Sequence, residues 1–315
     1  MEQTELNEQT ASEPSAVIAS DAIASPPSRN ETRVSAPVSP AACPTCSTAS
    51  EPNGAAITTP SYVFAIGRVE MRFPTIGVEK EFAQATGRAD TKGLTDEAAR
   101  HAVLSVPENR YILRKVCWVF TIQGLETYIV FPRDPADYDQ LLEAIRPPDS
   151  PLDTDVVVGM RGPIAPAEMC NGLMVPIVFF DQIYSFDRDA LINAIPPRKG
   201  AKSKEQDKKA SEEALSRITS LADNAGSTDE HRALNYLAVR YPKIYHIVSE
   251  AFENESSLTA VDVQPSTLSG TRNVVDVIFS FTNRKTDVVD KQFTRVDVTE
   301  EFPFLVTRMT SYFDR

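Results

Sequence analysis

The segment Asn273-Val-Val-Asp-Val-Ile-Phe-Ser-Phe-Thr282 decides the fold class of this chain. Every second residue from Val275 to Phe281 is large and apolar, and a period of two places these side chains on one face of a β-strand. Further strands are expected on either side of it, at 258–263 and 292–299. A run of consecutive strands, in place of a regular alternation of strands and helices, favours an α+β fold over a doubly wound sheet.

Upstream of this run, strands and helices are expected in mixed order. Strands are expected where β-branched and aromatic residues gather, and helices where apolar residues recur at helical spacing. The expected strands are 61–70, 110–122, 126–132, 153–161 and 173–186, with Gln123-Gly124 as a hairpin turn. The expected helices are 79–86, 95–105, 135–146, 188–195, 212–225 and 229–254, the last interrupted at Pro242. The sequence therefore predicts mixed, largely antiparallel sheets with packed helices.

Residues 1–60 differ from the rest of the chain in composition. They are mainly Ala, Ser, Pro, Thr and Glu, and they contain no aromatic residue. Such a segment buries too little apolar surface to offset the entropy lost on ordering. A disordered N-terminal arm is therefore predicted, followed by a folded body over 61–315. The lysine-rich segment 196–211 is the one linker-like stretch in the body, and it leaves open whether the body forms one domain or two subdomains.

Charge and hydropathy limit the location and the partners. The formal net charge of −12 argues against general affinity for nucleic acid or for an anionic membrane. No apolar run approaches the ~20 residues needed to span a bilayer. The start of the chain lacks the basic and apolar regions of a secretory signal. A cytoplasmic location is expected, where the four cysteines should be free thiols or metal ligands, since disulfides are rare in a reducing compartment.

The motifs of the common enzyme classes are missing from the sequence. There is no Gly-x-Ser-x-Gly segment and no glycine-rich phosphate loop, and the chain has three histidines in all. No cofactor is expected from these residues.

The strongest local motif is Cys43-Pro-Thr-Cys46, because two thiolates at this spacing can chelate zinc. A second close pair is missing, so four ligands would require Cys117, Cys170 or a histidine to be brought in by the fold. Two unligated cysteines in a disordered arm are the alternative. Cys117 lies in an apolar strand and is expected in the core, whereas Cys170 is expected in a turn.

Several stretches of the body carry a family resemblance. The first six are Tyr62-Val-Phe-Ala-Ile-Gly-Arg-Val-Glu70, Gly77-Val-Glu-Lys-Glu-Phe-Ala-Gln-Ala-Thr-Gly87, Gly124-Leu-Glu-Thr-Tyr-Ile129, Arg161-Gly-Pro-Ile-Ala-Pro166, Met169-Cys-Asn-Gly-Leu-Met-Val-Pro-Ile177 and Phe180-Asp-Gln-Ile-Tyr-Ser-Phe-Asp187. The others are Ala222-Asp-Asn-Ala-Gly226, Asp229-Glu-His-Arg-Ala-Leu-Asn-Tyr236, Ser269-Gly-Thr-Arg272 and Val298-Thr-Glu-Glu-Phe-Pro-Phe304. From residue 61 onward the chain resembles the C-terminal domain, of unknown function, of the cyanobactin maturation protease PatG and its companion PatA.

The resemblance implies a role in the maturation of ribosomal peptides. Proteins of the PatG type join this domain to a subtilisin-like protease that cleaves and macrocyclises a precursor peptide, and no protease residues are found here. The chain is therefore expected to be the accessory domain without the protease, a non-catalytic module that docks the precursor peptide or the maturation protease.

Two further hypotheses remain beside this one. The first is a metal-binding protein or cryptic enzyme centred on Cys170 with Asn171, Asp187 or His231, because an exposed cysteine of lowered pKa is a nucleophile. The second is a homo-oligomer in which an edge of the late sheet pairs across a twofold axis.

Overall fold

The computed structural model describes residues 61–87, 89–147, 153–186, 212, 215–216 and 224–313. The chain divides into two units, Met1–Ala56 and Ile57–Arg315, and every described residue belongs to the second. The predicted arm, the predicted helix 188–195 and the lysine-rich segment 196–211 lie outside the described residues.

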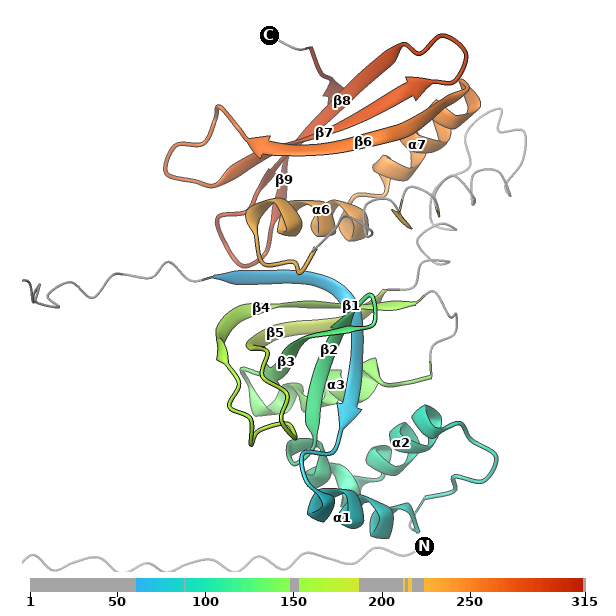
Figure 1. The fold of residues 1–315 in the computed structure, drawn as a ribbon, viewed down its shortest axis with the longest axis vertical. Helices are drawn as coiled ribbons and strands as arrows, with labels where there is room; N and C mark the ends of the chain where they lie inside the picture. The colour runs from blue at the N-terminus through green and yellow to red at the C-terminus, as the bar shows by residue number, and fades with distance from the viewer. Residues whose placement is uncertain are drawn as a thin grey trace, which may run out of the picture. The chain divides into compact units, whose positions relative to one another are not determined.

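The first half of the described chain forms a closed five-stranded barrel (Figure 1). Its strands are β1 (Tyr62–Arg72), β2 (Cys117–Ile122), β3 (Leu125–Pro132), β4 (Thr154–Ile164) and β5 (Pro176–Phe186). The order around the barrel is β1-β2-β3-β5-β4, and every pairing is antiparallel except that of β3 with β5. With a helix between β3 and β4, this is the topology of the OB-fold, a five-stranded Greek-key barrel.

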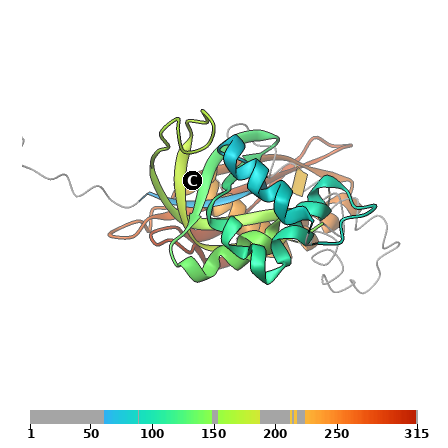
Figure 2. The same ribbon diagram turned by 90° about the horizontal axis from the view of Figure 1, so that it is seen from below.

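Helices close one end of the barrel. Between β1 and β2 the chain forms α1 (Ile76–Thr86), α2 (Asp96–Ser105) and the 3₁₀ helix η1 (Pro107–Arg114). Between β3 and β4 it forms η2 (Pro135–Asp137) and α3 (Tyr138–Ala144). Figure 2 shows α1 and α2 in front of the barrel when it is viewed from below. The apolar faces of these helices join the barrel interior in one buried cluster, which includes Leu104, Ile112, Trp118, Phe120 and Leu141.

The turn at Gln123-Gly124 is confirmed, but the strand expected before it is too long. Gln123 and Gly124 have φ values of 52° and 79°, the left-handed pair of a tight two-residue hairpin turn. Residues 107–114 are η1 and not the start of a strand. The physical reason is that Pro107 opens a helical turn that buries Ile112 and Leu113 in the barrel, so the apolar residues that suggest a strand face the core from a helix.

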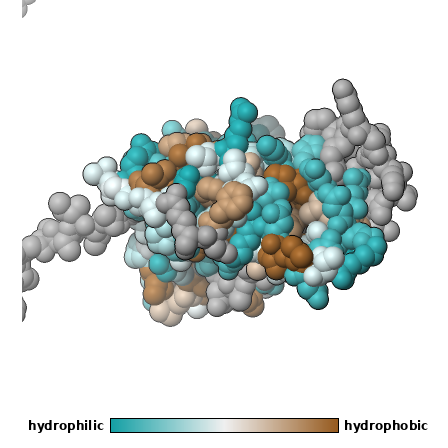
Figure 3. All heavy atoms as spheres, turned by 90° about the horizontal axis from the view of Figure 1, so that it is seen from above, coloured by the Kyte–Doolittle hydropathy of each residue, from teal (hydrophilic) through white to brown (hydrophobic). Residues whose placement is uncertain are grey.

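The second half is a four-stranded antiparallel sheet with two helices. The helices are α6 (Asp229–Arg240) and α7 (Lys243–Glu253), and they are separated at Pro242 as expected. The strands β6 (Ser256–Pro265), β7 (Val274–Asn283), β8 (Val289–Asp297) and β9 (Phe304–Ser311) pair in chain order. Figure 3 views the molecule from the side of this sheet and shows hydrophobic residues in separate small patches among hydrophilic ones.

Two details of this half differ from the expectation, although the α+β class with largely antiparallel sheets is confirmed. Strand β9 follows β8 where no strand is expected, and Asn224 and Ala225 are not helical. Within the described part of the chain, no helix is long and apolar enough to cross a lipid bilayer.

Helix α6 lies between the barrel and the second sheet (Figure 1). A single buried cluster contains Phe64 and Val158 from the barrel, Leu237 from α6, and Val277 and Phe279 from β7. The two halves of the described chain therefore share one hydrophobic core.

Hydrogen bonds to main-chain carbonyl groups strengthen this junction. Gly226 accepts a hydrogen bond from the amide of Phe64 at 2.8 Å, and Ala225 accepts one from the hydroxyl of Tyr128 at 2.8 Å. Within the second half, the buried guanidinium of Arg232 donates to the carbonyl oxygen of Val298 at 2.7 Å and also to that of Glu300. Residues 224–226, within a stretch that carries part of the resemblance, thus help to join the two halves.

Candidate functional site

The strand register defines a continuous row on the outer face of the barrel. Glu70 lies opposite Val119, Val119 opposite Ile129, and Ile129 opposite Ile177, so the row crosses β1, β2, β3 and β5. Directly opposite residues share a face of the sheet. The neighbouring Trp118 belongs to the interior cluster, so this row points outward.

The loop between β4 and β5, residues 165–175, covers this row. It is built from tight turns, in which Met169 donates to the carbonyl of Pro166 at 3.0 Å and Gly172 donates to that of Ala167 at 2.7 Å. Asn171 and Gly172 have φ values of 47° and 90°, which glycine and asparagine adopt more readily than other residues. The loop therefore has a defined shape of its own.

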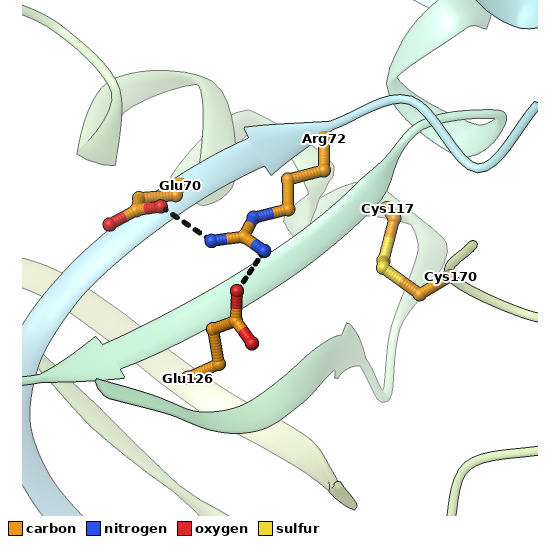
Figure 4. The surroundings of a disulfide bond; sticks show 5 residues. All are labelled: Glu70, Arg72, Cys117, Glu126 and Cys170. Carbon is orange, nitrogen blue, oxygen red and sulfur yellow. Dashed lines mark hydrogen bonds and ion pairs between the residues drawn. A yellow bond between two sulfur atoms is a disulfide. The ribbon is translucent and has the colours of Figure 1, made fainter. Parts of the chain in front are cut away.

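A disulfide fastens the loop to the barrel (Figure 4). Cys117, the first residue of β2, is bonded to Cys170 of the loop, with Cα atoms 5.7 Å apart and both residues 3% exposed. The expectation of free thiols or metal ligands is wrong for these two cysteines. The pair is 53 residues apart in sequence, and only the closure of the barrel brings the loop over the start of β2. In this form Cys170 has no thiolate and cannot act as a nucleophile.

Exposed apolar side chains surround the covered row. Cys117, Val119, Ile129, Ala165, Cys170 and Ile177 form a small buried cluster under the loop. At its margin Ile164, Met174 and Phe179 are 62%, 63% and 38% exposed. The ring of Phe179 lies where a side chain on Gly162 would be, because a Cβ there would come within 2.7 Å of it. We call the row, the loop and these three side chains the loop-covered face.

The end of this face nearest to α1 is charged. Arg72 lies opposite Cys117 on β1, and its guanidinium pairs with Glu70 at 3.2 Å and with Glu126 on β3 (Figure 4). The loop-covered face thus presents apolar groups at one end and an ion-paired cluster at the other.

The structure does not gather the other residues proposed from the sequence into one site. Asn171 follows Cys170 and shapes the turn, whereas His231 is half-buried in the first turn of α6, with its backbone amide capped by Thr228 at 3.2 Å. In Figure 1, α6 lies above the barrel, whereas the 165–175 loop lies at the lower left of the barrel, so His231 is far from Cys170. Asp187, Cys43 and Cys46 lie outside the described residues. Among the residues that the structure describes, no three His, Cys, Asp or Glu side chains form a group that could hold a metal ion.

Sequence reasoning missed a polar cavity of about 200 Å³ beside β1, between α2 and α3. Arg68, Arg100 and Arg146 line it together with Asp155. Burial raises the pKa of Asp155 to about 6, although its carboxylate accepts hydrogen bonds from the amide of Val69 at 2.8 Å and the hydroxyl of Ser185 at 3.0 Å. An isolated aspartate within a strand carries no sequence signal of burial.

The comparisons with known proteins agree on one domain type. Residues 201–312 match the family model described as PatG C-terminal. A solved structure described as "PatG Domain of Unknown Function" aligns with a TM-score of 0.67 at 19% identity, covering 80% of this chain and 98% of its own. No curated protein matches the chain. Residues 201–312 thus resemble the PatG C-terminal family, and the described body has the fold of a PatG domain of unknown function.

Proposed function

We propose that this domain is an interaction module in cyanobactin-type ribosomal peptide maturation, and that its loop-covered face binds a polypeptide partner, the precursor peptide or the maturation protease. The observation that carries the proposal is the exposed apolar margin formed by Ile164, Met174 and Phe179. These residues lie on β4, on the loop between β4 and β5, and on β5, beside the face of strands 2 and 3 with which OB barrels bind extended ligands.

The chemistry of the face favours a polypeptide over a nucleic acid. OB barrels that bind nucleic acids use basic grooves, whereas Arg72 is the cation of this face and is already paired with Glu70 and Glu126. The net charge of the chain is −12. Apolar side chains of a peptide would bury Met174 and Phe179, and methionine adapts its shape to varied apolar partners. The accessory role and the lack of a cofactor are parts of this proposal, and so is a cytoplasmic location, which requires the Cys117–Cys170 bond to persist in a reducing compartment.

The alternative role for Cys170, as a metal ligand or a nucleophile, requires a thiolate. It therefore requires the bond to Cys117 to be reduced first.

Calorimetric titration of the whole chain against the precursor peptide and against the protease domain tests the proposal. Two variants have matched exposure: Met174→Ser removes an apolar side chain of the face that is 63% exposed, and Leu268→Ser removes one that is 62% exposed in the loop between β6 and β7. We expect binding to one of the two partners, weakened roughly tenfold by Met174→Ser, since 1.4 kcal/mol of lost apolar contact is a factor of ten. Leu268→Ser should bind like the parent chain. An absence of binding to both partners, or an equal loss in both variants, would refute the proposal.

A further inference from the structure

A second cavity, of about 310 Å³, lies on a different face of the barrel. It is bounded by the outer faces of β1, β4 and β5, by α6, and by the segment that leads into β9. Phe64 and Val158 form its buried apolar floor. Phe302, which is 48% exposed, and the buried Pro303 stand at its margin.

Gln182 and Arg240 bring polar groups to this cavity. Gln182 lies opposite Val158 in the strand register and therefore shares its face. Arg240, the last residue of α6, lines the other side. Among the described residues Arg240 forms no ion pair, and the carboxamide of Gln182 makes no hydrogen bond. Among the described residues, no carboxylate therefore pairs with the guanidinium of Arg240.

The guanidinium of Arg240 is held in one orientation by an aromatic ring. Its central carbon lies 4.7 Å from the centroid of the Tyr184 ring. A cation–π contact uses the flat face of a guanidinium and leaves the N–H groups at its edge free to donate. The planar fork of N–H donors matches a carboxylate, which it binds through two parallel hydrogen bonds.

The nearby charged groups pair with one another. Arg133 pairs with Asp181 at 2.5 Å and with Glu301 at 3.4 Å. Burial and a hydrogen bond to Asp181 raise the pKa of Glu301, against the opposing effect of Arg133. Arg240 is therefore the cation of this region that lacks a carboxylate partner among the described residues.

We infer that this cavity binds the C-terminal residue of a peptide that ends in an apolar side chain. The carboxylate accepts hydrogen bonds from Arg240, the apolar side chain packs on Phe64 and Val158 under the ring of Phe302, and Gln182 bonds to the last peptide group. The ligand is defined by two features of one residue, its carboxylate and its apolar side chain, which match a guanidinium beside an apolar floor. This site is separate from the loop-covered face and does not depend on the function proposed for that face.

Titration of the whole chain with acetyl-Ala-Phe tests the inference, using the free acid and the C-terminal amide in parallel. We expect the acid to bind at least about tenfold more tightly than the amide, since the amide offers no charge to Arg240. Arg240→Gln should abolish the difference between acid and amide. Arg308→Gln is the matched control, because Arg308 is an exposed arginine on β9 with no ion pair among the described residues. It should preserve the difference.

Further variants keep the test valid if Arg240→Gln perturbs the fold. Arg240→Lys retains the charge but loses the planar fork, so it should bind the acid with intermediate affinity. Phe302→Ala should weaken acid and amide by the same factor. Equal affinity for acid and amide, no binding of either at millimolar concentration, or tighter binding of free phenylalanine than of the acetylated peptide would overturn the inference.

Discussion

Asn224 and Asn235 bind each other through two side-chain hydrogen bonds in opposite directions. Nδ2 of Asn224 donates to Oδ1 of Asn235 at 2.8 Å, and Nδ2 of Asn235 donates to Oδ1 of Asn224 at 3.1 Å. Nδ2 of Asn235 also donates to the carbonyl of Phe64 at 2.8 Å, while Oδ1 of Asn224 accepts from the amide of Gly226 at 3.3 Å. Both side chains are buried. The pair therefore links β1, the segment before α6, and α6 itself.

Replacing Asn235 by alanine should destabilise the whole described body. The change leaves the amide of Asn224 and the carbonyl of Phe64 buried without their partners, which costs about 1–3 kcal/mol for each unsatisfied group. We expect urea unfolding to report a free energy of unfolding lower by roughly 2–4 kcal/mol. Thr310→Ala, at an exposed position on β9, should change it by less than about 0.5 kcal/mol. A loss as small as that of the control would show that the amide pair contributes little.

Gly226 should not tolerate a side chain. Its φ is 70°, and a Cβ would lie 2.4 Å from the carbonyl oxygen of Phe64, a main-chain atom that cannot move aside without disturbing β1. Gly93 provides a matched control, since its φ is 76° and nothing lies within 4 Å of a Cβ there. Gly93→Ala should cost about 1 kcal/mol through backbone strain alone, and Gly226→Ala more than about 3 kcal/mol. Thermal unfolding of the two variants measures the difference, and equal melting temperatures would contradict it.

The disulfide should stabilise the body by restricting the unfolded chain. For a closed loop of 53 residues, the chain-entropy model gives about 4 kcal/mol, and measured disulfides often give less. Replacing both Cys117 and Cys170 by alanine should lower the free energy of unfolding by about 2–4 kcal/mol and make the 165–175 loop more sensitive to protease. A reductant should destabilise the parent chain and leave the double variant unchanged. Titration of both thiols as free in the unfolded, unreduced protein would show that the bond does not form.

Asp155 should make stability depend on pH. Its pKa of about 6 in the folded protein exceeds the ~3.9 of an unfolded chain, so folding takes up a proton between these values. The stability contributed by this uptake is fully present below about pH 4 and is lost as the pH rises through 6, amounting to at most about 3 kcal/mol. Asp155→Asn, which cannot ionise, should unfold with a shallower pH dependence between 4 and 7. Parallel stability curves for the two proteins would contradict the assignment.

Local signals in the sequence predict most of the elements. Thr95 before a run of acids predicts α2, and its side chain does accept from the amide of Ala98. Pro242 separates α6 from α7 as a helix-breaking residue should. Strand β9 is not predicted from local patterns, because apolar and polar residues alternate only weakly along it and its partner, β8, lies across a loop.

The closure of the barrel and the loop-covered face are not accessible from local patterns. β1 pairs with both β2 and β4, and no periodicity within β1 indicates two partners so far along the chain. Cys117 and Cys170 meet only once that closure exists, so the spacing of cysteines cannot reveal their bond. Arg240 and Gln182 reach one cavity for the same reason, from α6 and β5.

The hydrogen bond from Asn235 to Phe64 spans 171 residues, and this has a consequence for synthesis on the ribosome. Strand β1 is synthesised early, but α6, against which its outward side chain Phe64 packs, is synthesised much later. A nascent chain halted after β5 would expose Phe64, Val156 and Val158 to solvent. If the barrel folds alone during translation, its exposed apolar surface is prone to aggregation and needs chaperones until α6 and the second sheet have been synthesised.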